Sequence, residues 1–225
     1  MSNKKMMRVL GVLCFLLAPL SFIGAIYAQA RTGEYPNTWF SISATFYTPA
    51  APLMVGLLSM TGLVFNCYSG YDRIDKITAR ITGCAAFMIV LCPCLTKIAP
   101  KYVGLLLIPM EISNVIHCAS AAVLFGMFAY IIGFRFTKHG DLSIKEVWDN
   151  TWSSSIQCWG FSEGKQKRNR VYYICSFVIA AFMLVQVSTS VAGIGWMTIV
   201  NEWIMLTAFS VAWLTKGGLA KWLND

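Results

Sequence analysis

Long apolar stretches separated by short polar connections dominate the pattern of this chain. The hydrocarbon core of a bilayer is roughly 30 Å thick and needs about 20 mostly apolar residues in helical form. Six stretches approach that length, at residues 9–28, 50–68, 77–94, 112–134, 171–192 and 196–214. The short segments of alternating polarity that a membrane β-barrel requires do not occur. The pattern predicts an all-α, polytopic transmembrane helical bundle with six spans.

The composition agrees with a membrane protein. The chain of 225 residues is 57% hydrophobic and 12% charged, and its mean hydropathy is +0.61. These values lie outside the usual range of soluble domains. No repeat of fixed period and no low-complexity tract divides the chain. We therefore expect residues 1–225 to form a single membrane domain.

The distribution of lysine and arginine predicts the orientation, because short cytoplasmic connections are enriched in these residues. Of the 18 lysines and arginines, 15 fall on one side of the predicted spans, and only Arg31, Lys97 and Lys101 fall on the other. Both termini should therefore face the cytoplasm. The net charge of +8 follows from this topology and does not require a nucleic-acid partner.

The connection at residues 135–170 is the largest piece outside the predicted spans. Ser143 and Glu146 fit a capping box, which would start a helix by satisfying two unpaired backbone donors. An apolar face rich in tryptophan follows at mostly helical spacing: Ile144, Val147, Trp148, Trp152, Ile156 and Trp159. We expect this amphipathic helix to lie on the inner leaflet. The basic run at residues 165–170 would then contact anionic lipid.

The turn SGYDRID, residues 69–75, precedes the third predicted span. Asp75 is expected to cap the next helix, where a carboxylate accepts hydrogen bonds from exposed N–H groups and suits the positive end of the helix dipole. Asp72 would be satisfied by pairing with Arg73 or by solvent.

Ionisable side chains inside the predicted spans are the main functional signal. At about 1.5 Å per residue, His117 lies roughly 25 Å and Glu202 roughly 18 Å from the inner boundary. Both therefore fall in the outer half of the bilayer, and Glu111 and Asn114 precede His117 on the same helix. A charge at the bilayer centre costs about 2.5–3.5 kcal/mol on insertion scales. We expect His117 to pair with Glu202 or Glu111.

The direction in which His117 points follows from its neighbours. Cys118, Ala122 and Gly126 recur every four residues and form a stripe of small side chains. Such a stripe lets another helix approach closely. His117 lies beside this stripe and is therefore expected to point toward the bundle interior or its edge.

The outer connection after the first span supplies two hydroxyl groups, those of Ser41 and Ser43. Loops carried on a rigid scaffold often hold functional residues. The predicted ligand-binding site consists of six side chains, which are His117, Glu202, Glu111, Asn114, Ser41 and Ser43.

Several functions fit this site. We expect a non-enzymatic protein that binds a membrane lipid or small amphiphile, or associates with a membrane-protein partner or a second copy of itself. A membrane hydrolase would instead use His117 to activate Ser41, Ser43 or a water. A proton-coupled transporter would use the titration of histidine near neutral pH. A purely structural polar contact between the fourth and sixth spans is the remaining alternative.

No metal or other cofactor is expected. Membrane hydrolases that include the alkaline ceramidases hold zinc with three histidines, whereas this chain has only His117 in a span and His139 in a connection. Cys92 and Cys94 would give a metal only two thiolates, which is a weak site. Most of the eight cysteines are expected to be small packing residues.

Several stretches together resemble bacterial six-span inner-membrane proteins. They are SISATFY, GYDRID leading into GCAAFMIVLCP, the single histidine early in the next long span, RNRVYY before the fifth span, and Glu202 in the last. The resemblance covers most of the chain and implies the same fold and a bacterial inner (plasma) membrane. Its motifs have no assigned chemistry, so it implies no activity.

Overall fold

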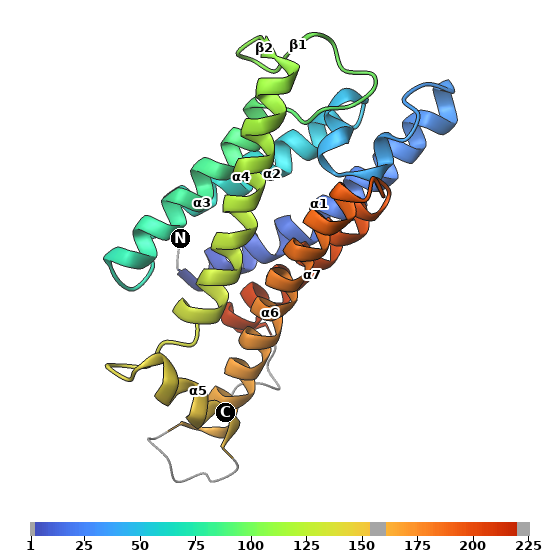
Figure 1. Ribbon diagram of the computed structural model, residues 1–225. Helices are drawn as coiled ribbons and strands as arrows, with labels where there is room; N and C mark the ends of the chain where they lie inside the picture. Colours follow the sequence, from blue (N-terminus) through green and yellow to red (C-terminus); the bar gives the residue numbers. More distant parts are fainter. Residues whose placement is uncertain (1–2, 154–160, 220–225) are drawn as a thin grey trace.

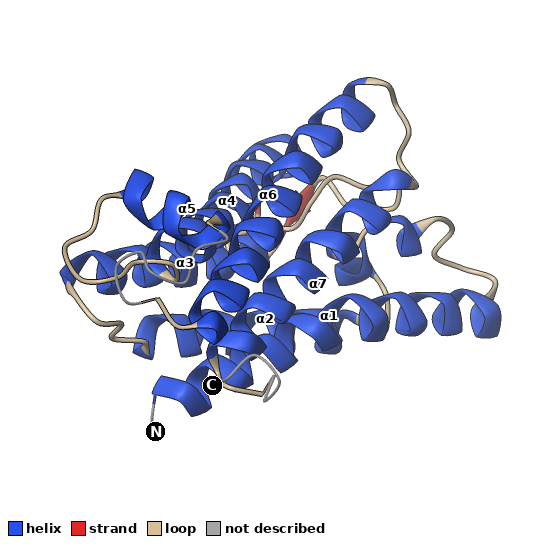
Figure 2. Ribbon diagram, turned by 90° about the horizontal axis from the view of Figure 1, so that it is seen from below, coloured by secondary structure: helices blue, strands red, loops and turns tan. Residues whose placement is uncertain are grey.

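The computed structural model describes residues 3–153 and 161–219, and this part of the chain is mainly helical (Figures 1 and 2). Its α-helices are α1 (Asn3–Thr32), α2 (Ala51–Cys67), α3 (Arg73–Leu91), α4 (Met110–Tyr130), α5 (Ile144–Trp152), α6 (Glu163–Val191) and α7 (Met197–Lys216). Shorter elements are the 3₁₀ turns η1 (Thr38–Phe40) and η2 (Ser43–Tyr47) and the π-helical turn η3 (Ile131–Arg135). Strands β1 (Tyr102–Val103) and β2 (Ile108–Pro109) form an antiparallel hairpin.

The long helices form a closed ring in the described part of the chain. Helix α1 packs against α2, α2 against α3, α3 against α4, α4 against α6, α6 against α7, and α7 against α1. The hairpin end of the bundle holds residues 33–50, the β1–β2 hairpin and residues 192–196. The opposite, α5 end holds the start of α1, the turn before α3, and the end of α7 (Figure 1).

Aromatic side chains fill the centre of the ring. Phe65 of α2, Phe128 of α4, and Phe209 and Trp213 of α7 are all buried. The Phe128 and Phe209 ring centroids are 3.8 Å apart, and the Phe65 and Trp213 centroids are 5.2 Å apart. Large rings bury much apolar area and gain further energy from edge-to-face contact, so this cluster joins three helices that are distant in sequence.

Helices α2 and α3 approach each other closely at two glycines. A Cβ atom on Gly83 would lie 2.8 Å from the Gly62 carbonyl oxygen and 2.2 Å from Asn66 Nδ2. A Cβ atom on Gly62 would lie 3.2 Å from the Gly83 carbonyl oxygen. Small residues that allow backbones to meet are typical of helix pairs in membranes.

Each predicted apolar stretch lies within or overlaps one helix of the ring, so the all-helical fold is confirmed. Four helices of the described residues are long and apolar enough to cross a membrane: α1, α4 continued by η3, α6 and α7. Helix α2 is apolar but has only 17 residues. Helix α3 carries Arg73, Asp75, Lys76 and Arg80 in its first turns, which makes that part too polar for a bilayer core.

The capping box at the start of α5 is confirmed. Ser143 Oγ accepts a hydrogen bond from the Glu146 amide, and the Glu146 carboxylate accepts one from the Ser143 amide at 2.8 Å. Helix α5 packs on α6 and leaves Trp148 and Trp152 a little less than half exposed. The helix ends at Trp152, and the predicted face residues Ile156 and Trp159 lie outside the described residues.

Candidate functional site

Residues 41–43, at the hairpin end, connect the two short turns of the loop between α1 and α2. Ser41 ends η1 in an extended conformation, and Ile42 precedes η2. The Thr45 amide and hydroxyl both bond to the Ile42 carbonyl oxygen, which fixes the start of η2. We call residues 41–43 the closing segment, because they lie between α4 and α7 and contact both.

Glu202 of α7 binds one part of the closing segment. Its carboxylate accepts a hydrogen bond from the Ile42 amide at 2.7 Å and from Ser41 Oγ at 3.2 and 3.3 Å. Among residues 3–153 and 161–219, no cationic side chain forms an ion pair with Glu202. The carboxylate is therefore stabilised by charge-assisted hydrogen bonds from a loop.

His117 of α4 binds the other part. Its Nδ1 lies 2.8 Å from the Cys92 carbonyl oxygen, and its Nε2 lies 3.0 Å from Ser43 Oγ. Because a carbonyl oxygen can only accept, Nδ1 must carry a proton. In the neutral imidazole Nε2 is then an acceptor, and Ser43 donates to it. His117 is 5% exposed and Ser43 is 9% exposed, so this pair is shielded from solvent.

The expected pairing of His117 with Glu202 or Glu111 is wrong. In the described part of the chain the imidazole bonds to Ser43 and Cys92, whereas Glu202 bonds to the closing segment. The two helices do bring their polar groups to the same end of the bundle. Loop hydroxyls and a backbone amide reach between them, so each group is satisfied without the other.

A small cavity lies beneath the closing segment. Its volume is about 40 Å³, and Ser43 and Glu202 are its polar lining residues on the side of the segment. The remaining walls are mainly apolar and include Leu17, Leu58 and Phe128. A cavity of this size holds a water or two, and a lipid or amphiphile requires that the closing segment move.

Two of the predicted site residues lie elsewhere. Glu111 is exposed in the first turn of α4. The Asn114 side chain accepts a hydrogen bond from the Leu95 amide at 2.8 Å, and Ser113 donates to the Pro93 carbonyl oxygen at 2.8 Å. Asn114 therefore attaches the connection between α3 and α4 to the top of α4, and does not contact the closing segment.

His117 points inward, as predicted, but the expected small-residue interface beside it is wrong. Cys118 and Ala122 are exposed, and Gly126 is only partly covered. The buried face of α4 instead comprises Met110, Ser113, His117, Ser120, Leu124 and Phe128. Helix α4 therefore packs through residues at steps of three and four that include large side chains, and Cys118 and Ala122 of the predicted stripe face outward.

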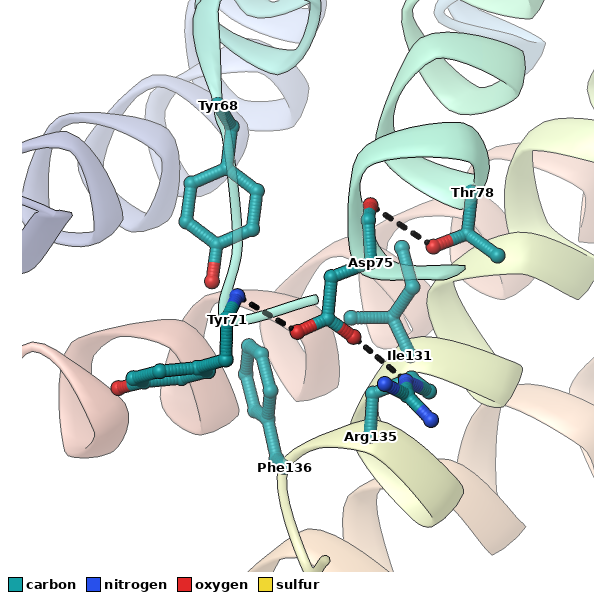
Figure 3. Close-up of a pocket in the computed structure, with 7 residues that line it drawn as sticks. All are labelled: Tyr68, Tyr71, Asp75, Thr78, Ile131, Arg135 and Phe136. Carbon is teal, nitrogen blue, oxygen red and sulfur yellow. Dashed lines mark hydrogen bonds and ion pairs between the residues drawn. The ribbon is translucent and has the colours of Figure 1, made fainter. Parts of the chain in front are cut away.

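A second polar cluster lies at the α5 end and joins the start of α3 to η3 (Figure 3). The Asp75 carboxylate lies between the Tyr71 amide, at 2.9 Å, and Arg135 Nε, at 2.5 Å. Arg135 also pairs with Asp72. The guanidinium group thus bridges two carboxylates, and the π-helical turn η3 ends at the residue that supplies it.

This cluster corrects the predicted capping of α3. Asp72 is the N-cap, since its carboxylate accepts from the Asp75 amide at 2.9 Å, and its cationic partners are Arg135 and Lys138 rather than Arg73. That backbone hydrogen bond, together with the bonds from Arg135 and Lys138, holds the pKa of Asp72 well below its usual range. Because Asp72 caps the helix, the Asp75 carboxylate instead accepts a hydrogen bond from the Tyr71 amide of the preceding turn and pairs with Arg135.

Comparison with known proteins finds no family model, no curated protein and no solved structure that matches this chain. The candidate sites are therefore argued from geometry and chemistry alone. In the described residues no group of three or more His, Cys, Asp or Glu side chains could hold a metal ion.

Sequence reasoning missed the groups that complete the outer site. The Ile42 amide and the Cys92 carbonyl belong to the backbone, and no side-chain pattern distinguishes them. Arg135 was counted only as an orientation signal. Its position directly after the apolar stretch at residues 112–134, with Asp72 and Asp75 in a turn on the same predicted side of the membrane, was the available signal for the second cluster.

Proposed function

We propose that the chain is a multi-pass protein of the bacterial inner membrane, with six spans and both termini in the cytoplasm. Four long apolar helices support membrane insertion. The closed ring supports two further, shorter spans, because α2 and α3 lie within it. Fifteen of the 18 lysines and arginines belong to segments that the proposed topology assigns to the cytoplasm, in accord with the positive-inside rule.

We further propose that the protein binds a lipid or small amphiphile at the outer site. The observation that carries this proposal is Glu202, a carboxylate whose partners are a serine hydroxyl and a backbone amide of a loop. Carboxylates within membrane helices are costly and usually functional. A polar head group that donates hydrogen bonds can replace Ser41 and Ile42 on Glu202 and displace the closing segment from the cavity below.

The surroundings of the closing segment suit an amphiphile. Phe22 of α1 contacts Trp39 of η1 and Trp203 of α7, with ring centroids 6.1 and 5.8 Å apart. Tryptophan is favoured where a membrane meets water, since its ring is apolar and its N–H is polar. A head group at Glu202 would therefore have an apolar, aromatic border toward the bilayer. Association with a second copy or another membrane protein at this face is the variant of the proposal without a small ligand.

The test is lipid recovery by native mass spectrometry of protein extracted in native membrane discs. Glu202→Gln keeps the shape of the side chain but removes its charge, and we expect it to lose a bound amphiphile. Glu111→Gln is the matched control, because Glu111 is exposed at the same end of the bundle and should retain the ligand. Equal recovery from both variants and the wild type would count against an outer binding site.

A serine hydrolase is the second candidate, and Ser43 with His117 favours it. Ser43 Oγ would attack the ester carbonyl carbon of a lipid while His117 Nε2 takes its proton and then delivers it to the departing alcohol. Water would hydrolyse the resulting acyl-serine. The Cys92 carbonyl, 2.8 Å from Nδ1, would hold the imidazole in the tautomer required. Access of substrate again requires movement of the closing segment.

A fluorophosphonate probe separates the hydrolase from the binding protein. If the protein is a hydrolase, the probe should label the wild type covalently, and the labelling should disappear in Ser43→Ala. It should persist in Ser41→Ala, because the Ser41 hydroxyl of the wild type bonds to Glu202 and not to His117. A wild-type protein that is not labelled would contradict the hydrolase proposal.

The transporter alternative has less support. It expects broken helices at the site, whereas α4 and α7 are uninterrupted at His117 and Glu202.

A further inference from the structure

A cleft of about 340 Å³ opens at the α5 end of the bundle, opposite the hairpin end that holds the outer site. Its described lining includes five cationic side chains from three helices, which are Lys4, Arg8, Lys165, Arg168 and Lys216. Tyr71, Phe136 and Tyr172 supply an aromatic wall, and no acidic side chain is among the described lining residues. The cleft thus gathers positive charge from the start of α1, the start of α6 and the end of α7.

Three of these cations are held in place by backbone carbonyl groups. Lys216 Nζ donates to the Phe136 carbonyl oxygen at 3.0 Å, and Lys165 Nζ donates to the Thr137 carbonyl oxygen at 3.4 Å. Arg8 Nε donates to the Gly217 carbonyl oxygen at 2.7 Å. Each of these bonds uses one donor of a side chain that has several, so further donors remain for a ligand.

Lys216 is also surrounded by rings. Its Nζ lies 5.2 Å from the Phe136 centroid, 5.6 Å from that of Tyr71 and 5.8 Å from that of Tyr172. Contacts of this kind orient an ammonium group and reduce its access to water. The group is therefore positioned on the aromatic wall of the cleft rather than extended into solvent.

Nearby carboxylates are already engaged by other cations. Asp72 and Asp75 pair with Arg135, and Lys138 also contacts Asp72. Glu163, close to Lys165 in sequence, pairs with Lys167 at 2.6 Å. Like charges brought together in a partly buried cleft repel one another, so a bound anion would stabilise this arrangement.

We infer that this cleft binds a phosphate group. Several ammonium and guanidinium donors that converge on one space suit the multiple charged oxygens of phosphate. The cleft volume is within the usual range of ligand sites, about 300–1,000 Å³. The phosphate can come from the head group of an anionic lipid or from a soluble phosphate compound. This inference does not depend on the proposed outer site.

The test uses purified full-length protein in dodecyl maltoside with two probes. Phosphatidic acid is compared with diacylglycerol of the same acyl chains by native mass spectrometry, and inorganic pyrophosphate is titrated by calorimetry. We expect Lys165→Gln with Lys216→Gln to weaken phosphate binding about tenfold or more, because both substitutions remove charge-assisted hydrogen-bond donors from the cleft. Lys76→Gln with Lys145→Gln removes the same charge from two exposed side chains outside the cleft and should bind like the wild type.

A milder variant guards against misfolding. Lys4 is exposed at the rim, and Lys4→Glu should weaken binding while leaving the anchored cations in place. Binding of phosphatidic acid without pyrophosphate would identify a lipid head group as the source, and binding of both would identify the phosphate group itself. An equal loss of affinity in the cleft variants and in the control with Lys76 and Lys145 replaced would overturn the inference. It would also be overturned if the wild type showed no preference for phosphatidic acid and no binding of pyrophosphate.

Discussion

The imidazole Nε2 of His117 lies 3.0 Å from the hydroxyl oxygen of Ser43, across 74 positions of sequence. This contact joins the loop between α1 and α2 to the buried face of α4. Glu202 joins the same loop to α7 through Ser41 and Ile42. Two helices are therefore connected at the hairpin end by a three-residue segment instead of by a direct pair of side chains.

Removal of the Ser43 hydroxyl should release this segment. Ser43→Ala leaves Nε2 of a buried imidazole without its partner, which we expect to cost about 1–3 kcal/mol of unfolding free energy. Amide hydrogen exchange over residues 38–47 should rise as the segment opens. Ser188→Ala is the control, because this hydroxyl is exposed and bonds to the carbonyl of its own helix. Unchanged exchange in Ser43→Ala would show that His117 does not hold the loop.

Arg135 should be essential to the α5 end. Arg135→Gln leaves the buried Asp75 carboxylate without its cation, and the loss of one partner from such a pair typically costs about 3–5 kcal/mol. We expect a large decrease in the thermal unfolding temperature in detergent. Arg73 is exposed at the start of α3, so Arg73→Gln should change the unfolding temperature little. A similar effect of both substitutions would contradict the assigned pairing.

The stability contributed by Asp72 should depend on pH. Its pKa is lowered in the folded protein, relative to an unfolded value of about 3.9. A lowered pKa stabilises the fold above the unfolded value, and this contribution disappears as the pH falls through the folded value. The difference in unfolding temperature between wild type and Asp72→Asn should therefore be constant above about pH 5 and shrink below about pH 4. A difference that grows on acidification would refute this assignment.

The contact between α2 and α3 should not accept a methyl group. Gly83→Ala would place a Cβ atom 2.8 Å from the Gly62 carbonyl oxygen, and overpacking of this kind costs about 1–3 kcal/mol. Gly56→Ala, in α2, meets nothing within 4 Å and should be neutral or slightly stabilising, because alanine favours helix. Thermal unfolding of both variants in the same detergent tests the contact. If Gly83→Ala is as stable as Gly56→Ala, the close contact between α2 and α3 at Gly83 is disproved.

The helical fold could be predicted because hydrophobic length is a local property. Each run of apolar residues specified a helix without knowledge of its neighbours, and the capping box of Ser143 and Glu146 specified the start of α5. The charged first turns of α3 also explain why this helix is less apolar than the long spans. The order in which the helices follow one another around the ring could not be predicted, because it depends on contacts between helices that the hydrophobic pattern does not encode.

The candidate site could be predicted only in part. Depth counting correctly placed His117 and Glu202 at one end of the bundle, and both outer-loop serines contact them. The partners could not be assigned, because a flexible loop can satisfy a buried group as well as another helix can. Asn114 shows the same limit, since its partner is the Leu95 amide and every residue except proline carries an amide N–H.

The basic cleft illustrates a second limit. In the sequence, lysine and arginine were explained by orientation and, for the run at residues 165–170, by contact with anionic lipid. No local pattern groups Lys165 with Lys4 and Lys216. Only the packing of α1, α6 and α7 brings them to one space. A charge cluster formed by segments that are distant in sequence can therefore be identified from the fold but not predicted from the sequence.

A density map of wild-type protein extracted in native membrane discs tests the central proposal most directly. If Glu202 binds an amphiphile, the map will show non-protein density within hydrogen-bond distance of its carboxylate and residues 41–43 moved away from it. If Ser41 and Ile42 still occupy the carboxylate and no additional density adjoins it, the proposed binding function is wrong.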